Sequence, residues 1–329
     1  MKKIALIACS NGYGHIKRLL LLSQSLIKNG SDPVLFAPAQ AVHALTKSEN
    51  VTAPKLVDFD TNTRIENWLD GTSVNWVNFI PSLDCFDIVI SDNLIEVLLI
   101  RPDSWLLGSF FWHESLNFIP YSLKVQSIDI LRKHTPRMIS SIFFSSEELK
   151  LHTKFFEVGL FTDKTLSINT KGKNDALISC GLGGEINEQV KKFDEFISIR
   201  KKPKFNRVWV EPNILPYECP DWMIPATYTY KMYQNIIAAI IRPGVGTITS
   251  ALLSGARIFP FYEDNNKEME LNASRIYYHK VGEKRQTLSN AWSKAELFLT
   301  DEKSQKKHFQ KVRDISMNGS DESAKIILS

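Results

Sequence analysis

The sequence predicts an α/β protein with two domains, each built on a doubly wound parallel sheet. Strand-like and helix-like segments alternate along the 329 residues, a pattern typical of parallel strands that are joined by helices. Two glycine-containing loops, 12–15 and 242–247, each follow an apolar run and precede a helix-like segment. Because one such loop lies in each half of a chain long enough for two cores, we expect two Rossmann-like domains that face one cleft.

Apolar runs place the strands of the first half at residues 3–9, 33–37, 55–58, 87–91, 105–111 and 139–144. A helix is expected over 15–29, because leucine and isoleucine recur there at helical spacing and Asn29-Gly30 is a strong stop signal. These elements assign residues 1–160 to an N-terminal domain.

The pattern changes at residues 161–174, which are polar and lack periodicity, so we predict an interdomain linker there. A C-terminal, ligand-binding domain is expected over 175–329, and its last helix is a candidate to pack back on the N-terminal domain. Its expected elements are a strand at 175–180, a glycine-rich loop at 181–184, a helix at 185–198, strands at 206–211, 237–241 and 257–261, and a charged helical tail from 289.

The composition bounds the class of protein. The hydrophobic fraction of 43% and the charged fraction of 23% are typical of soluble globular proteins, and no run approaches the roughly 20 apolar residues of a membrane span. A net charge of +4 is too mild to indicate nucleic-acid binding, but it suits a polyanionic small ligand or peripheral contact with an anionic membrane. We expect a cytoplasmic protein. The alternative is a protein that associates peripherally with the inner face of the membrane.

The four cysteines are scattered and form no CxxC pair, so neither a zinc site nor a disulfide framework is indicated. Asp58-Phe59-Asp60 matches the Asp-x-Asp that binds a metal-nucleotide in some transferases. This tripeptide is common by chance and lies in the half without the phosphate-type loop. We therefore expect no metal site and no required cofactor.

His15 is the first candidate catalytic residue. It follows Gly14 at the carboxyl end of the first strand, where open parallel sheets bind their ligands. An imidazole with a pKa near neutral can take a proton from a hydroxyl or from water. The alternative is a structural histidine at a helix start. Lys17 and Arg18 either supply positive charge to this site or are solvated surface charges.

Two carboxylates are candidates for the same site. Asp92 directly follows the strand at 87–91, where it would either orient His15 or cap the next helix. Glu114, in the pair His113-Glu114, follows another apolar strand and is the second candidate base. The aromatic residues before it are expected to belong to the core, and the alternative is that they line an acceptor site. These residues are Trp105, Phe110, Phe111 and Trp112.

The second loop predicts a diphosphate site. Gly244 and Gly246 can expose backbone N–H groups at a helix start, and Arg242 adds a cation. Hydroxyl donors follow at Thr247, Thr249 and Ser250. Carboxylates near a phosphate are repelled by it, so the downstream acidic residues would bind sugar or ribose hydroxyls or else belong to a solvated loop. These downstream residues are Glu263, Asp264, Glu268 and Glu270, and they lead into Asn272.

Residues 237–276 resemble the nucleotide-sugar-binding segment of the GT-B glycosyltransferases, and residues 9–27 resemble their N-terminal Gly-x-Gly-His loop. The resemblance implies a GT-B fold, with His15 as general base and with Gly246 and Thr247 at the donor phosphates. It is greatest to the branch that contains the peptidoglycan N-acetylglucosaminyltransferase and to hydrolases of UDP-linked deoxysugars. The string Gly14 to Arg18 is similar to the hydrolase version.

Two departures from the family pattern concern the donor. Many relatives carry His-Gly-Gly where this chain has Arg242-Pro243-Gly244, and an acidic residue followed by Gln where it has Glu268-Met269. The missing amide leaves the nucleotide base open, with a UDP-sugar as the first expectation.

We therefore expect an inverting, metal-independent glycosyltransferase. It would move a sugar from a nucleotide-sugar to a glycan, glycolipid or other hydroxyl acceptor, in bacterial surface-glycan synthesis. One alternative is a nucleotide-sugar hydrolase in which water replaces the acceptor. The other is a non-catalytic protein that binds nucleotide-sugars.

Overall fold

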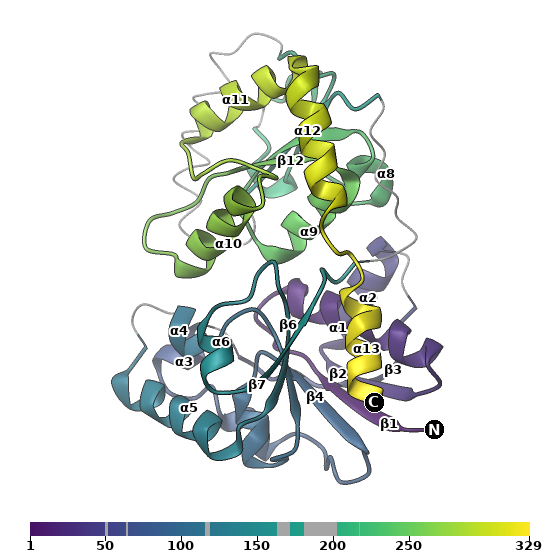
Figure 1. Ribbon diagram of the computed structural model, residues 1–329, viewed down its shortest axis with the longest axis vertical. Helices are drawn as coiled ribbons and strands as arrows, with labels where there is room; N and C mark the ends of the chain where they lie inside the picture. Colours follow the sequence, from purple (N-terminus) through teal and green to yellow (C-terminus); the bar gives the residue numbers. More distant parts are fainter. Residues whose placement is uncertain (50–51, 64, 116–118, 163–171, 181–202, 217) are drawn as a thin grey trace. The chain divides into compact units, whose positions relative to one another are not determined.

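The computed structural model describes residues 1–49, 52–63, 65–115, 119–162, 172–180, 203–216 and 218–329. The chain divides into two compact units (Figure 1). Unit 1 comprises Met1–Asp163 and Ser316–Ser329, and unit 2 comprises Lys164–Ile315. Each unit is built on a parallel sheet with helices, so the predicted α/β class is confirmed. The loop expected at 181–184, the helix expected at 185–198 and most of the expected linker lie outside the described residues.

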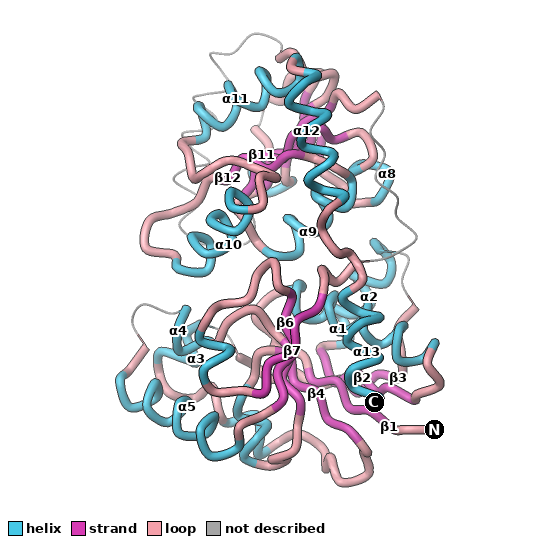
Figure 2. The backbone as a smooth tube through the Cα atoms, in the orientation of Figure 1, coloured by secondary structure: helices cyan, strands magenta, loops and turns pink. Residues whose placement is uncertain are grey.

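Unit 1 contains a seven-stranded parallel sheet in the order β3-β2-β1-β4-β5-β6-β7 (Figure 2). The strand order reverses between β1 and β4, which is the position where doubly wound sheets bind ligands. The strands are β1 (Lys3–Ile7), β2 (Asp32–Ala37), β3 (Lys55–Asp58), β4 (Ile88–Asp92), β5 (Trp105–Leu107), β6 (Arg137–Ser141) and β7 (Lys154–Val158).

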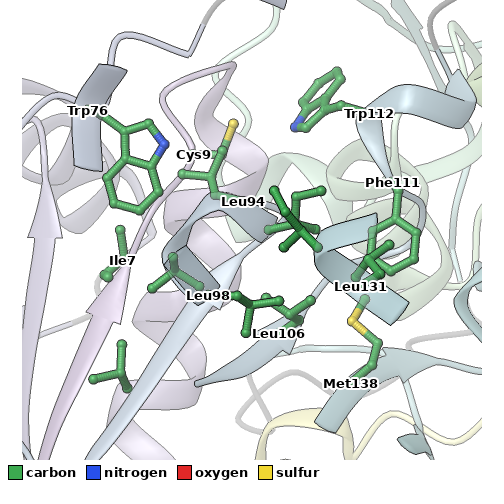
Figure 3. Close-up of a cluster of buried hydrophobic side chains, with 14 of the residues drawn as sticks. Ile7, Cys9, Trp76, Leu94, Leu98, Leu106, Phe111, Trp112, Leu131 and Met138 are labelled. Atoms are coloured by element: carbon green, nitrogen blue, oxygen red, sulfur yellow. The ribbon is translucent and has the colours of Figure 1, made fainter. Parts of the chain in front are cut away.

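The two faces of this sheet have separate cores, because successive side chains of a strand point to opposite faces. Along β1, Ile4 and Leu6 pack in the cluster that includes α1 (Tyr13–Lys28) and α13 (Gly319–Leu328). The alternate residues Ala5 and Ile7 pack in the cluster on the other face, together with Trp76 (Figure 3). Both faces are covered by helices, as a continuous apolar strand requires.

The remaining helices of unit 1 join or flank these strands. They are α2 (Ala39–Glu49), α3 (Ile65–Leu69), η1 (Asn75–Asn78), η2 (Ile95–Leu99), α4 (Trp112–Ser115), α5 (Tyr121–His134) and α6 (Glu148–Leu151). The strand expected at 105–111 is shorter than predicted. At Gly108 the backbone lies so close to Asn93 that an added Cβ would be 2.6 Å from its Oδ1, and the chain turns into α4 soon afterwards.

Unit 2 contains a five-stranded parallel sheet in the order β10-β9-β8-β11-β12, with its reversal between β8 and β11. The strands are β8 (Asp175–Ser179), β9 (Val208–Val210), β10 (Met223–Pro225), β11 (Ile236–Ile241) and β12 (Arg257–Pro260). The helices are η3 (Pro212–Ile214), α8 (Tyr230–Tyr233), α9 (Val245–Ser254), α10 (Lys267–Tyr278), α11 (Leu288–Thr300) and α12 (Glu302–Arg313). None of the described helices is both long enough and apolar enough to cross a bilayer.

Candidate functional site

The first turn of α1 is open to a ligand. Gly12 occupies the N-cap position with φ of 101°, a conformation that favours glycine, and no side chain caps the helix. The first turn contains no acidic residue, and a Cβ added at Gly14 would have no atom within 4 Å. The unpaired N–H groups of this turn therefore remain available for an anion or an oxyanion.

Within the same helical turn, His15 and Arg18 both bind Asp92, the last residue of β4. The Nδ1 atom of His15 lies 2.7 Å from Asp92 Oδ1. Arg18 donates from Nε to Oδ2 at 2.7 Å and from Nη2 to Oδ1 at 2.6 Å. Asp92 thus binds His15 and does not cap a helix, since η2 begins at Ile95 with Leu94 in the N-cap position.

The charges around Asp92 determine which atom of the His15–Asp92 pair carries the shared proton. Burial of Asp92 alone would raise the pKa of its carboxyl, but the charges and hydrogen bonds of Arg18 and His15 hold that pKa below its ordinary value. An ionised carboxylate only accepts hydrogen bonds, so Nδ1 of His15 carries the proton. In the neutral imidazole the lone pair is then on Nε2, which is the form that a general base needs.

An aromatic wall lies beside His15. The ring of Trp112, on α4, is 6.1 Å from the His15 ring and stacks on Trp68 at 5.9 Å. Both indoles are buried, and neither indole N–H has a hydrogen-bond partner within the described residues. The aromatic residues before Glu114 were expected first as core residues, and all of them are buried: Trp105, Phe110, Phe111 and Trp112. Trp112 also lies beside the imidazole of His15.

Glu114 lies on the same short helix as Trp112. Its Oε2 accepts a hydrogen bond from Ser146 Oγ at 3.0 Å, and burial raises the pKa of its carboxyl to about 7. A carboxyl that titrates near neutral can act as a base. Among the described residues, however, no hydrogen bond joins Glu114 to His15 or Asp92. Its neighbour His113 is neutral, because burial lowers its pKa to about 4.

A hydroxyl cluster that the sequence did not reveal supports the loop before His15. The backbone N–H of Ser10 lies 3.2 Å from Thr61 Oγ1 and 3.3 Å from Thr63 Oγ1, and Cys9 Sγ lies 3.3 Å from Thr63 Oγ1. Both threonines are buried. Nothing in the local sequence after β3 distinguishes Thr61 and Thr63 from other polar loop residues, because their partners are about 50 positions earlier.

In unit 2, the loop before α9 has the same open character. Gly244 is the N-cap without any side-chain cap, and the first turn of α9 has no acidic residue. A Cβ added at Gly244 or at Gly246 would meet no atom within 4 Å. Of the expected hydroxyl donors, Thr247 and Ser250 are half-buried, whereas Thr249 is buried and donates to Val245 O at 2.7 Å within the helix. The hydroxyl proton of Thr249 is therefore already used in a hydrogen bond within the helix.

Arg242, expected as a phosphate-binding cation, forms an ion pair with Glu263. Its Nε and Nη2 atoms contact the Glu263 carboxylate at 2.8–3.3 Å, and Asn266 also donates to that carboxylate. Burial alone would lower the Arg242 pKa, but Glu263 raises it above its ordinary value, and the same pairing lowers the pKa of Glu263. The charge of Arg242 is thus largely offset within the protein.

The other acidic and amide residues of this segment occupy different positions. Asn272 is buried and donates from Nδ2 to Pro243 O at 2.9 Å, so it supports the loop from behind. Glu268 is half-buried and Glu270 is exposed, both in the first turn of α10. Asp264 is exposed and pairs with Arg285. Glu268 and Glu270 remain candidates for sugar hydroxyls.

A second polar cluster, missed in the sequence, lies at the carboxyl ends of β8 and β9. Glu211 accepts from Ser179 Oγ at 3.0 Å and from the backbone N–H of Cys180 at 2.8 Å. The hydroxyl of Tyr228 lies 3.0 Å from Ser179 Oγ. Arg242 N donates to Ser179 O at 2.9 Å, which joins this cluster to the α9 loop.

The Asp-x-Asp tripeptide has local structural roles. Asp58 Oδ1 accepts from Ala39 N at 2.8 Å, at the start of α2, and Asp60 Oδ1 accepts from Asn62 N at 2.7 Å. Across the described part of the chain, no group of three or more His, Cys, Asp and Glu side chains is arranged to hold a metal ion.

Comparison with known proteins identifies the fold. No family model and no curated protein matches the chain. The calicheamicin glycosyltransferase CalG4 is 14% identical with a TM-score of 0.65, over 100% of this chain and 98% of that one. The spinosyn rhamnosyltransferase SpnG, complexed with thymidine diphosphate, is 12% identical with a TM-score of 0.63, over 97% and 98%. Arabidopsis thaliana UGT89C1, complexed with UDP, is 11% identical with a TM-score of 0.63 over the full length of both chains. The chain thus has the GT-B fold of these glycosyltransferases.

Proposed function

We propose that this chain is an inverting glycosyltransferase that moves a sugar from a nucleoside-diphosphate-sugar to a hydroxyl acceptor without a metal ion. The observation that carries the proposal is the contact of His15 with the buried Asp92 at 2.7 Å, at the start of α1 in a GT-B fold. A catalytic base needs a fixed tautomer and a free lone pair, and this contact supplies both.

In the proposed reaction, unit 1 supplies the base and unit 2 holds the donor. His15 Nε2 takes the proton of the acceptor hydroxyl while that oxygen attacks the anomeric carbon of the sugar. The bond from the anomeric carbon to the diphosphate breaks in the same step, so the configuration inverts. Asp92 stabilises the imidazolium, and the N–H groups at Gly246 and Thr247 stabilise the leaving diphosphate.

The neighbouring structures guide the choice of substrates. Complexes of UGT89C1 with UDP and of SpnG with thymidine diphosphate support a pyrimidine nucleoside diphosphate as the donor nucleotide, with UDP first. UGT89C1 has also been solved with quercetin, which supports an acceptor that carries hydroxyl groups. We extend the acceptor class to the glycans and glycolipids of bacterial surfaces.

The deciding experiment measures nucleotide release from a panel of UDP-, TDP-, GDP- and CMP-sugars, with and without hydroxyl acceptors. A transferase releases nucleotide only when an acceptor is present and forms a glycosylated product of inverted configuration. Equal release in water alone would assign the chain as a hydrolase. Tight binding without release under any condition would assign it as a binding protein.

We also expect transfer to continue in the presence of EDTA. The proposed leaving-group stabilisation uses backbone N–H groups at a helix start, and both carboxylates of Asp58-Phe59-Asp60 are hydrogen-bonded to the backbone. The measurement is the initial rate with EDTA, and with Mg²⁺ or Mn²⁺ added back. Loss of activity in EDTA that either ion restores would contradict the expectation.

A further inference from the structure

Unit 2 contains a cavity at the end of its strands opposite to the α9 loop. The cavity has a volume of about 710 Å³ and is lined by the start of β12, by residues that follow α10, and by α11 and α12. The α9 loop follows the carboxyl end of β11, whereas Arg257 is the first residue of the parallel strand β12. The two therefore lie at opposite ends of these neighbouring strands. Volumes of about 300–1,000 Å³ are typical of small-ligand sites.

The lining of this cavity is strongly basic. Among its described residues, two carboxylates stand against five cations, which are Arg257, Lys280, Lys294, Lys307 and Lys311. Both carboxylates have structural partners. Glu283 pairs with Arg257 at 2.7 Å, and Asp301 caps α12 by accepting from Ser304 N at 3.0 Å. Lys294 also pairs with Glu283 at 3.7 Å and Lys311 with Asp314 at 3.4 Å, so the positive excess rests mainly on Lys280 and Lys307.

Two helices present their lysines to the cavity at helical spacing. On α11 and its C-cap, the lining residues are Lys294, Leu297, Phe298 and Asp301, and on α12 they are Ser304, Lys307, His308, Gln310 and Lys311. Apart from Gln310, each set follows the spacing i, i+3, i+4, i+7, which marks one face of a helix. Lys303 and Lys306 lie on α12 as well but do not line the cavity.

The wall behind the lysines is apolar with one buried acceptor. Phe298 and His308 are buried, with their rings 5.5 Å apart. His308 Nε2 lies 3.0 Å from Gly255 O, so Nε2 carries the proton, and Nδ1 has no partner within the described residues. Burial lowers the pKa of His308 to about 3, so the ring is neutral and Nδ1 accepts.

We propose that this cavity is a second ligand site, which takes a small phosphorylated polyol such as a sugar phosphate. The lysines would bind the phosphate, and Leu297 and Phe298 would contact the C–H face of a ring. A concave site with a buried apolar wall fits a small ligand better than it fits a flat membrane surface. The proposal is independent of the glycosyl-transfer reaction.

The test is calorimetric titration of the full chain with glucose 1-phosphate and, separately, with inorganic phosphate. The double variant Lys307→Gln/Lys311→Gln should weaken glucose 1-phosphate binding by about tenfold or more. The matched control Lys303→Gln/Lys306→Gln removes the same charge from the same helix and should leave binding unchanged. Wild type should bind glucose 1-phosphate more tightly than inorganic phosphate, and Gly246→Val, at the α9 loop, should retain this binding.

Four results would overturn the proposal. Equal weakening by both lysine pairs would mean general electrostatic attraction. Loss of binding in Gly246→Val, with binding retained in Lys307→Gln/Lys311→Gln, would place the ligand at the α9 loop. Binding to phosphatidylglycerol vesicles that requires Lys307 and Lys311, without binding of glucose 1-phosphate, would assign the surface to membranes. Inorganic phosphate binding as tightly as glucose 1-phosphate would overturn the polyol class.

Discussion

At the scale of single residues, the contact between His15 and Asp92 makes the sharpest prediction. His15→Ala should lower kcat by about 10²–10⁴-fold, because a positioned general base contributes that much, while nucleotide affinity stays near wild type. Asp92→Asn should lower kcat less, since it keeps the side-chain volume but loses the charge that favours the imidazolium. Steady-state kinetics and calorimetry separate the two effects. Near-normal turnover of His15→Ala would transfer the role of base to Glu114.

Glu96 makes a prediction about stability. It is buried in η2, and burial raises the pKa of its carboxyl to about 8. The unfolded chain releases this proton near pH 4.5 and the folded chain near pH 8, so wild type should lose stability as pH rises between these values. Glu96→Gln should remove this loss, which is on the order of a few kcal/mol. Urea denaturation at pH 5 and pH 8 measures it, and an unchanged pH dependence in Glu96→Gln would contradict it.

The residue types at the site were predictable only where a motif carries them. His15 follows from a glycine loop after an apolar run, because local sequence defines both. The sequence leaves Arg18 between a role at the site and a solvated surface position, and its bidentate contact with the buried Asp92, 74 positions away, shows that it is not a solvated surface charge. Arg242 was expected at a phosphate, but a carboxylate 21 positions later binds it. Side-chain partners across strands are set by tertiary packing, which one sequence does not display.

At the scale of elements, we predict that a substitution in the α9 loop lowers nucleotide affinity without lowering the stability of the fold. Gly246 does not require a positive φ, and a Cβ there meets no atom within 4 Å, so Gly246→Val should fold normally. Its side chain would occupy the space beside the first N–H groups of α9, where we place the diphosphate. Nucleotide affinity should therefore fall at least about tenfold, by loss of charge-assisted hydrogen bonds. Unchanged affinity in calorimetry would remove the nucleotide from this loop.

The central strands of both sheets were predictable, as were the edge strands β3 and β12, but the other two edge strands were not. Strands such as β1 and β11 are continuous apolar runs, because both of their faces are covered. The edge strands β7 and β10 were missed. In β7 only Val158 is fully buried, and β10 has three residues and ends in proline, so neither shows a clear apolar run. Proline is tolerated at such edges because it need not donate to a neighbour.

At the scale of the whole molecule, the chain begins and ends in the same unit. The last helix, α13, packs on α1 and near β7, with Ala324 and Ile327 buried in the core that β1 also enters. Residue periodicity identified the tail as helical, but periodicity carries no information on which of two sheets a helix covers. The placement depends on backbone contacts at its start, where Leu160 N donates to Ser316 O at 2.8 Å and Gly319 N donates to Leu160 O at 2.9 Å.

The packing of α13 on unit 1 depends on Gly159 and Gly319, which allow the backbone at the start of α13 to approach the backbone after β7. A Cβ added at Gly319 would lie 2.2 Å from Gly159 O, which is backbone and cannot move aside as a side chain can. Gly319→Ala should therefore destabilise unit 1 by about 1–3 kcal/mol, the usual cost of overpacking. Gly246→Ala is the matched control, since its Cβ meets no atom within 4 Å. In denaturant unfolding, only Gly319→Ala should lower the transition midpoint, because an alanine in place of Gly246 inside α9 favours the helix. Nucleotide affinity, which we assign to unit 2, should not change in Gly319→Ala. Equal stability of the two variants would mean that α13 does not depend on this contact.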